Sequence, residues 1–113
     1  MVKVEAIVQP LKLDEIRAAL ADLGISGVTI VNVLNHSGPP GLKARYRGGE
    51  YFADVPKVKL EIVVSSDDAD EVIDCISRAT RSGVPGDDGM ILVSEIAEAI
   101  RLRNGRRMEL VHR

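Results

Sequence analysis

The residues best suited to bind another molecule are gathered in one short stretch, ARYRGGEYFAD, residues 44–54. It holds the three aromatic side chains of the chain, Tyr46, Tyr51 and Phe52, among charged residues and around two glycines. Tyrosine and arginine are enriched where binding energy concentrates at protein interfaces. The stretch therefore predicts an arm that docks a partner protein. The alternative is a short β-ribbon that packs its aromatic rings on its own subunit.

Side chains for catalysis or metal binding are sparse. His36 and His112 lack a second ligand at metal-binding spacing, and no nucleophile, base and orienting group occur together. We interpret both histidines as solvated. Cys75 is the single cysteine and shares a helical face with Val72 and Ile76, which favours a small core residue over a reactive thiol. These residues predict a binding protein rather than an enzyme.

The composition restricts the class of protein. A chain of 113 residues fits one domain, 1–113, with an aliphatic core. Its 15 basic and 17 acidic side chains give a net charge of −2 without a basic block, so binding to a nucleic-acid backbone has no electrostatic basis. No apolar run approaches the roughly 20 residues of a transmembrane helix, and the N-terminus does not resemble a signal peptide. We expect a cytoplasmic domain that is not embedded in a membrane.

The elements that must position the arm repeat along the chain. VKVEAIV (2–8) and VKLEIVV (58–64) predict strands, and each is followed by a segment with a helical apolar stripe. Further strands are expected at 28–34 and 90–93. Two strand–helix–strand units predict an α+β, ferredoxin-like fold, with one antiparallel sheet and both helices on one face. The turn at Asn104-Gly105 predicts an extra hairpin in the C-terminal segment, 97–113.

Two features of this predicted fold bear on function. The connection between the strands that end near Leu34 and begin near Lys57 exceeds the roughly 12–15 residues usual in compact domains, which is typical of a functional loop. The sheet face without helices would expose Ile7 and Val63 in a monomer, so we expect an oligomer. RNA-recognition modules share this order of elements, but their central strands carry aromatic residues that 2–8 and 58–64 lack.

YRGGEY, followed closely by PKVKLEIVV, resembles the PII family of nitrogen-regulatory signalling proteins. The resemblance covers nearly the whole chain and includes VEAIVQPLKLDEIRAAL, GISGVTI and AIRLRNG. It implies a homotrimer of ferredoxin-like subunits that binds ATP or ADP in clefts between subunits. It also implies that a long loop, the T-loop (36–55), acts on a target protein such as a transporter or a metabolic enzyme.

The resemblance implies the positions of the nucleotide contacts. Two arginines of the C-terminal motif, Arg101 and Arg103, match the family's phosphate clamp, and alternation along a strand would put both on one side. A pair of solvated strand arginines is the alternative. The phosphate-side loop, called the B-loop (83–90), offers glycine N–H groups to a phosphate, or forms only a tight turn. The remaining implied contacts are Ile7, Gly27, Thr29, Glu61, Val63, Gly86, Asp87 and Gly89.

The resemblance also implies roles in the T-loop. Tyr51 matches a tyrosine that is uridylylated in some members, although tyrosines in such loops more often pack or touch partners. Arg47 matches an arginine that plugs an ammonium channel in some members. Partner contacts are expected at Tyr46, Arg47, Tyr51 and Phe52.

Departures from the family pattern concern the ligands. Pro39 replaces a glutamine that helps to coordinate Mg²⁺ and 2-oxoglutarate, and proline supplies neither an amide side chain nor a backbone N–H. Lys57, the match to a lysine that contacts 2-oxoglutarate, is retained. The B-loop is one residue longer than is usual in the family. Met90 replaces a phosphate-binding lysine, which removes a contact of roughly 1.5–3 kcal/mol. Mg²⁺ and 2-oxoglutarate binding are therefore in doubt.

Two hypotheses follow from these residues. In the first, the chain is a divergent PII-type regulator in nitrogen metabolism that binds ATP or ADP, with AMP as a further candidate, and its 2-oxoglutarate sensing is altered or absent. In the second, it senses a different small metabolite or anion and regulates a transporter or an enzyme outside nitrogen control.

Overall fold

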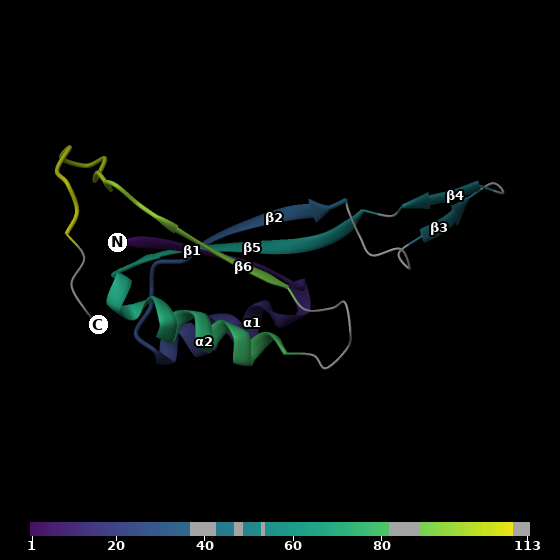
Figure 1. The fold of residues 1–113 in the computed structure, drawn as a ribbon, viewed down its shortest axis with the longest axis horizontal. Helices are drawn as coiled ribbons and strands as arrows, with labels where there is room; N and C mark the ends of the chain where they lie inside the picture. Colours follow the sequence, from purple (N-terminus) through teal and green to yellow (C-terminus); the bar gives the residue numbers. More distant parts are fainter. Residues whose placement is uncertain (37–42, 47–48, 53, 82–88, 110–113) are drawn as a thin grey trace.

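A computed structural model describes residues 1–36, 43–46, 49–52, 54–81 and 89–109. Its main sheet is antiparallel and has the strand order β2-β5-β1-β6. The predicted α+β, ferredoxin-like fold is confirmed (Figure 1). The elements are β1 (Val2–Val8), the 3₁₀ turn η1 (Pro10–Lys12), α1 (Leu13–Asp22), β2 (Thr29–Asn35), β3 (Lys43–Tyr46), β4 (Gly49–Phe52), β5 (Val55–Val64), the 3₁₀ turn η2 (Ser66–Asp68), α2 (Ala69–Thr80) and β6 (Met90–Glu95).

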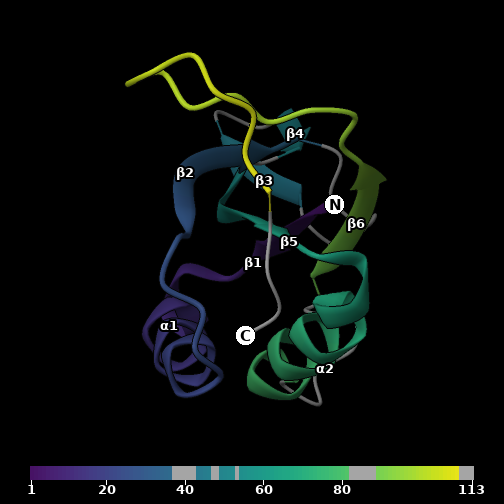
Figure 2. The ribbon, with the colours of Figure 1, turned by 90° about the vertical axis from the view of Figure 1, so that its left-hand side faces the viewer.

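The core lies between the sheet and the two helices. Figure 2 shows α1 and α2 side by side beneath one face of the sheet. Alternate residues of β1 and β5 face these helices, and Ile16, Leu20, Val72 and Ile76 meet them from the helical side. The strict alternation of buried and half-buried positions in β1 is the period of a strand with one covered face. The remaining buried residues are Val2, Val4, Ala6, Val8, Val58, Leu60, Ile62, Val64 and Ala69.

Local sequence features begin and end the helices. Gly24 ends the α1 segment with φ +88°, a conformation that glycine adopts without steric cost, and its N–H donates to the Ala21 carbonyl at 2.9 Å. The Ser65 hydroxyl accepts a hydrogen bond from the Asp67 N–H at 3.2 Å, which caps η2 just before α2. Cys75 packs, half-buried, against the core as predicted.

None of the described helices covers the opposite face of the sheet. Its exposed apolar side chains come from three strands and include Val31, Val63, Met90 and Leu92. We call this surface the open face. Such an apolar surface is unusual on a monomer, as the sequence analysis anticipated.

The T-loop contains a second, two-stranded sheet of β3 and β4. The β-ribbon considered as an alternative is therefore present in the backbone. It extends beyond the ends of β2 and β5, away from the main sheet, rather than lying against it (Figure 1). Tyr46 is in β3, and Tyr51 and Phe52 are in β4. Arg47 and Pro39 lie outside the described residues.

A hairpin is present in the described part of the C-terminal segment, residues 97–109. A bridge joins Ile100 to Arg107, and the Arg101 N–H donates to the Arg106 carbonyl at 2.8 Å. Between them the chain turns, with Gly105 at φ +68° and the Asn104 side chain accepting from the Arg106 N–H at 2.9 Å. The predicted turn at Asn104-Gly105 is confirmed. Within the described part of the chain, no helix is both long and apolar enough to cross a membrane.

Candidate functional site

One group of candidate contacts lies at the T-loop end of the sheet. Ile7 is the next-to-last residue of β1 and pairs with Met90 of β6 on one side and Lys59 of β5 on the other. These partners place Ile7 on the open face. Lys57 pairs with Val33 of β2 and is half-buried on the same face.

Gly89 belongs to this group and needs to be glycine. It directly precedes β6, and a Cβ atom built on it would overlap the backbone carbonyl oxygen of Ile7. The two backbones can approach this closely only because glycine has no side chain. The end of the B-loop is thereby held against Ile7. Gly86 and Asp87 lie outside the described residues.

A second group lies further along the open face. Thr29, the first residue of β2, pairs directly with Glu61 of β5. Val63 follows two positions later on the same face and is 39% exposed. Gly27 is exposed just before β2, and a Cβ there would contact nothing within 4 Å. The structure therefore brings Thr29, Glu61 and Val63 onto one face.

The two clamp candidates lie elsewhere. Arg101 and Arg103 are exposed in the C-terminal hairpin, which follows β6, and Arg103 is inside its turn. The expectation that the two arginines alternate along one strand and point to the same side is therefore wrong. The Ile96 N–H donates to the Met1 carbonyl at 3.1 Å, which holds the start of this segment beside the N-terminus.

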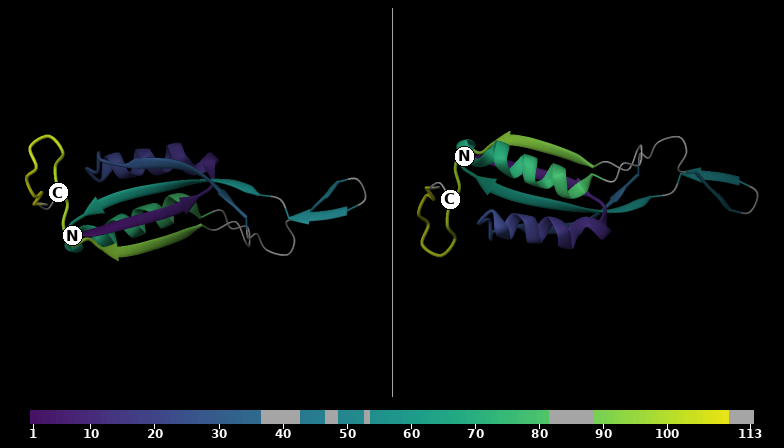
Figure 3. Two further views of the ribbon diagram at one scale, coloured as in Figure 1. Left: turned by 90° about the horizontal axis from the view of Figure 1, so that it is seen from above. Right: turned by 90° about the horizontal axis from the view of Figure 1, so that it is seen from below.

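These positions put the candidates of one subunit at opposite ends of the sheet. Gly89 precedes β6 and Arg101 follows it, so at about 3.3 Å per residue the six residues of β6 alone separate them by roughly 20 Å. Figure 3 shows residues 97–109 at one end of the sheet and the β3–β4 ribbon beyond the other. A single subunit does not bring the B-loop end and the arginines together.

A charged cluster that the sequence analysis missed occupies the middle of the open face. Lys3 Nζ lies 2.9 Å from Glu5, and Lys59 Nζ lies 3.2 Å from Glu61. Glu5 and Glu61 face each other across β1 and β5. The hydrogen bond from Lys3 lowers the pKa of Glu5, and the same bond raises the pKa of Lys3. The repeated Lys-x-Glu pattern in the two strands could have revealed these pairs.

A second missed contact closes the base of the T-loop. His36 Nδ1 lies 2.5 Å from Asp54 Oδ1, one residue beyond the last β2–β5 pair, Asn35 with Val55. His36 is exposed, as predicted, but it is not simply solvated. His112 lies outside the described residues.

The described residues offer little for metal or thiol chemistry. Among them, no group of three or more His, Cys, Asp or Glu side chains is placed to hold a metal ion. Burial raises the pKa of the Cys75 thiol, which disfavours the nucleophilic thiolate.

Comparison with known proteins identifies the family. The family model "Nitrogen regulatory protein P-II" matches residues 1–106. A Nitrogen regulatory protein P-II from Bradyrhizobium diazoefficiens is 46% identical over 106 residues, which cover 93% of this chain and 94% of the relative. The chain belongs to the P-II family. Two further relatives are each 45% identical to this chain over 106 residues. They are a Nitrogen regulatory protein P-II from Klebsiella oxytoca and Nitrogen regulatory protein P-II 1 from Escherichia coli K12.

Membership confirms the resemblance drawn from YRGGEY and its flanking motifs. P-II proteins are signal-transduction regulators rather than enzymes, which agrees with the lack of a catalytic constellation in the sequence. The matched residues cover 94% of the length of these relatives.

Proposed function

We propose that this chain is a homotrimeric P-II regulator that binds ATP or ADP between subunits and controls a target protein through its T-loop, in nitrogen metabolism. Each nucleotide site would combine the open-face and B-loop residues of one subunit with Arg101 and Arg103 of a neighbour. 2-Oxoglutarate sensing would be altered or absent.

The observation that carries this proposal is the separation of the two halves of the candidate site. Gly89, held against Ile7, and the arginines lie at opposite ends of β6. Only a second copy can place Arg101 and Arg103 beside the B-loop end of the first. The exposed apolar open face supports such an assembly, because packing against another copy would remove that surface from water.

The departures at the ligand residues support altered sensing. Met90 is 56% exposed on the open face and pairs with Ile7, so its thioether occupies the place of an ammonium that would meet a phosphate. Pro39 removes the amide implied for Mg²⁺ and 2-oxoglutarate. The retained Lys57 is then the remaining cation for a 2-oxoglutarate-type ligand.

The same departures favour a second candidate function. A P-II protein with Met90 and Pro39 at these positions suits a different small metabolite or anion, which would regulate a transporter or an enzyme outside nitrogen control. A thermal-shift screen of metabolites beside nucleotides separates the two functions. A metabolite that stabilises the protein without any adenine nucleotide supports the second.

Titration calorimetry with ATP, ADP and AMP, each with and without 2-oxoglutarate and Mg²⁺, tests the first function. We expect an adenine nucleotide to bind, and Arg103→Gln to weaken it roughly tenfold to a hundredfold, since one charge-assisted hydrogen bond contributes about 1.5–3 kcal/mol. Arg106→Gln, the same charge change in the same exposed hairpin, is the control and should bind normally.

Two results would overturn parts of this proposal. The absence of binding by any adenylate up to about millimolar concentration, which corresponds to a binding free energy of about −4 kcal/mol, would remove the nucleotide site. Mg²⁺-ATP-dependent binding of 2-oxoglutarate with ordinary strength would contradict the altered sensing.

Mass spectrometry of the protein from its native cells shows whether Tyr51 is modified.

A further inference from the structure

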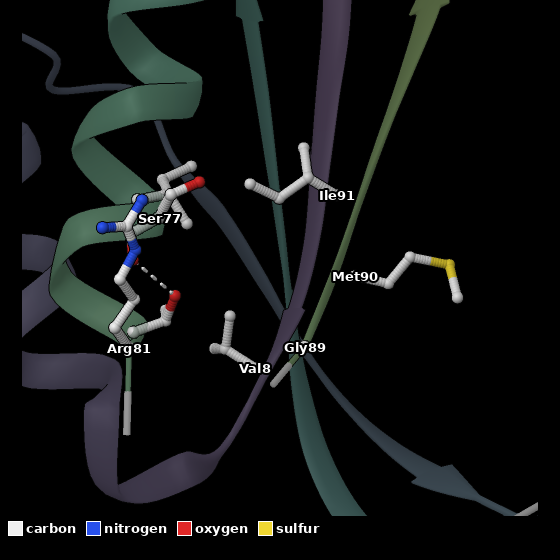
Figure 4. Close-up of a pocket in the computed structure, with 8 residues that line it drawn as sticks. Val8, Ser77, Arg81, Gly89, Met90 and Ile91 are labelled. Carbon is white, nitrogen blue, oxygen red and sulfur yellow. Dashed lines mark hydrogen bonds between the residues drawn. The ribbon is translucent and has the colours of Figure 1, made fainter. Parts of the chain in front are cut away.

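A cavity lies on the helical side of the sheet, away from the open face. It has a volume of about 460 Å³ and opens between the C-terminal end of α2 and the adjoining ends of β1 and β6 (Figure 4). Ligand sites in proteins have volumes of roughly 300–1,000 Å³, so this cavity has room for a small metabolite.

The floor of the cavity is apolar and rigid. Val8 and Ile76 belong to the buried core, and Ile91 is half-buried beside them. Because these side chains are fixed by core packing, the floor is already formed before any ligand arrives. Transfer of an apolar group from water onto it is favourable.

The rim of the cavity is polar and carries one cation. Ser77, Thr80 and Arg81 line it from the last turn of α2. The Thr80 hydroxyl already donates to the Ser77 carbonyl at 3.2 Å, so the donors that face a ligand are the Ser77 hydroxyl and the Arg81 guanidinium. Figure 4 shows the Arg81 guanidinium beside Ser77. Within the described part of the chain, no carboxylate pairs with Arg81.

Arg81 contrasts with its neighbour on the same helix. Arg78 is bound to Asp74 at 2.8 Å, an ordinary surface ion pair four residues apart. Among the described residues, Arg81 has no such partner, and it stands over an apolar floor. A guanidinium of this kind binds carboxylate or phosphate oxygens through two parallel hydrogen bonds.

This cavity shares Gly89 with the proposed nucleotide contacts, but its floor and its polar rim lie on the helical side of the sheet. Met90 and Ile91 both line the cavity, although the Met90 side chain extends away from α2 in Figure 4 and pairs with Ile7 of the open face. A second cavity of about 390 Å³ near α1 includes Arg17, but its other lining residues are exposed or only half-buried, so it has no fixed apolar floor.

We propose that the cavity at Arg81 binds a small organic anion. Its oxyanion would accept hydrogen bonds from the Arg81 guanidinium and the Ser77 hydroxyl. A short branched apolar body would cover Val8, Ile76 and Ile91. This proposal does not depend on nucleotide binding, because every residue of the cavity comes from one subunit.

Backbone-amide NMR titration of the nucleotide-free protein tests the site. The probe is 4-methylpentanoate, and its neutral isostere 4-methylpentanamide has the same shape without the charge. Inorganic phosphate, added separately, shows whether the anion alone suffices. We expect saturable shifts of the amide resonances of 77–81 and 89–91 with the carboxylate, and much weaker shifts with the amide.

Matched variants assign the contact. Arg81→Gln should weaken binding by about tenfold or more, since a charge-assisted hydrogen bond is lost, whereas Arg78→Gln should bind as the parent does. Ser77→Leu fills the cavity and should abolish binding while the dispersion of the spectrum shows that the fold is kept.

Several outcomes would overturn the proposal. These are no shift at high probe concentration, equal binding of the amide and the carboxylate, equal affinity in the Arg81→Gln and Arg78→Gln variants, or shifts confined to residues 24–30 at the second cavity. Binding of inorganic phosphate alone, with the same shifts and no gain from the apolar body, would overturn the role of the floor.

Discussion

At the scale of single residues, Gly89 shows how a B-loop position can be required for geometric reasons. The family resemblance implies that Gly89 donates its backbone N–H to a phosphate. The structure adds that a side chain at this position would collide with the Ile7 backbone. Gly27, the other described glycine among the nucleotide candidates, has open space around it.

Gly89→Ala should therefore be destabilising. The added methyl group forces β6 or β1 to shift, and forcing an extra group into a packed site typically costs about 1–3 kcal/mol. The free energy of unfolding, from urea titration followed by far-ultraviolet circular dichroism, measures this. Gly27→Ala is the control and should change stability by less than about 0.5 kcal/mol. Equal stabilities of the two variants would show that the close approach to Ile7 is not present.

At the scale of elements, the strands were predictable because their pattern is strict. Residues 2–8 alternate between a covered and an open face, and the structure has a strand with the same bounds. The prediction that Arg101 and Arg103 lie in one strand is wrong because the chain turns at these residues. The turn chemistry of Asn104 and Gly105 already acts at Arg101, whose carbonyl accepts the Gly105 N–H at 2.8 Å.

Contacts between distant residues were the least predictable. The pair of His36 and Asp54 depends on the register of β2 with β5, and two exposed polar residues 18 positions apart give no sign of this in the sequence. The charge pairs on β1 and β5 are different, because both partners lie two residues apart on one strand. Alternation alone would have put them on the same face.

The pairing of Lys3 with Glu5 predicts a pH dependence of stability. The pKa of Glu5 is lowered in the folded protein. Glu5 therefore contributes to the free energy of unfolding above its ordinary pKa of 4.5, and this contribution is lost as the pH falls below that value. The pKa of Lys3 is raised, so Lys3 contributes to stability below its ordinary pKa of 10.5, and this contribution is lost as the pH rises above that value. Glu5→Gln should make the urea midpoint less sensitive to acid.

Urea midpoints measured from about pH 7 to about pH 3 check this expectation. Glu15→Gln is the control, because the Glu15 side chain is 64% exposed and its carboxylate lies 3.9 Å from Lys12 Nζ. This variant should keep the acid sensitivity of the parent. A Glu5→Gln protein with the parent's full acid sensitivity would show that the open-face pair contributes nothing.

At the scale of the whole molecule, the open face and the divided candidate site both call for more than one copy. Both described helices lie on one side of the sheet, and exposed apolar residues on the other side come from β2, β5 and β6. The charged cluster at its centre would have to remain hydrogen-bonded when another copy covers it, because an unpaired buried charge is costly.

Leu92→Glu tests this assembly. Leu92 is 48% exposed on the open face and pairs with Glu5, so the substitution adds a carboxylate opposite an existing one. We expect the parent to sediment at three times the subunit mass of 12.2 kDa and the variant as a single subunit. Leu11→Glu, at a 91% exposed position in η1, should remain assembled. A monomeric parent protein would refute the proposed composite site.

The placement of the aromatic residues has a practical consequence for spectroscopy. The chain has no tryptophan, and both of its tyrosines lie in the β3–β4 ribbon, well away from the core. Ultraviolet emission from the unlabelled protein therefore arises from the ribbon alone and is silent about the core. Binding of a target to this ribbon should therefore change the intrinsic tyrosine emission, so that docking can be followed without an attached dye.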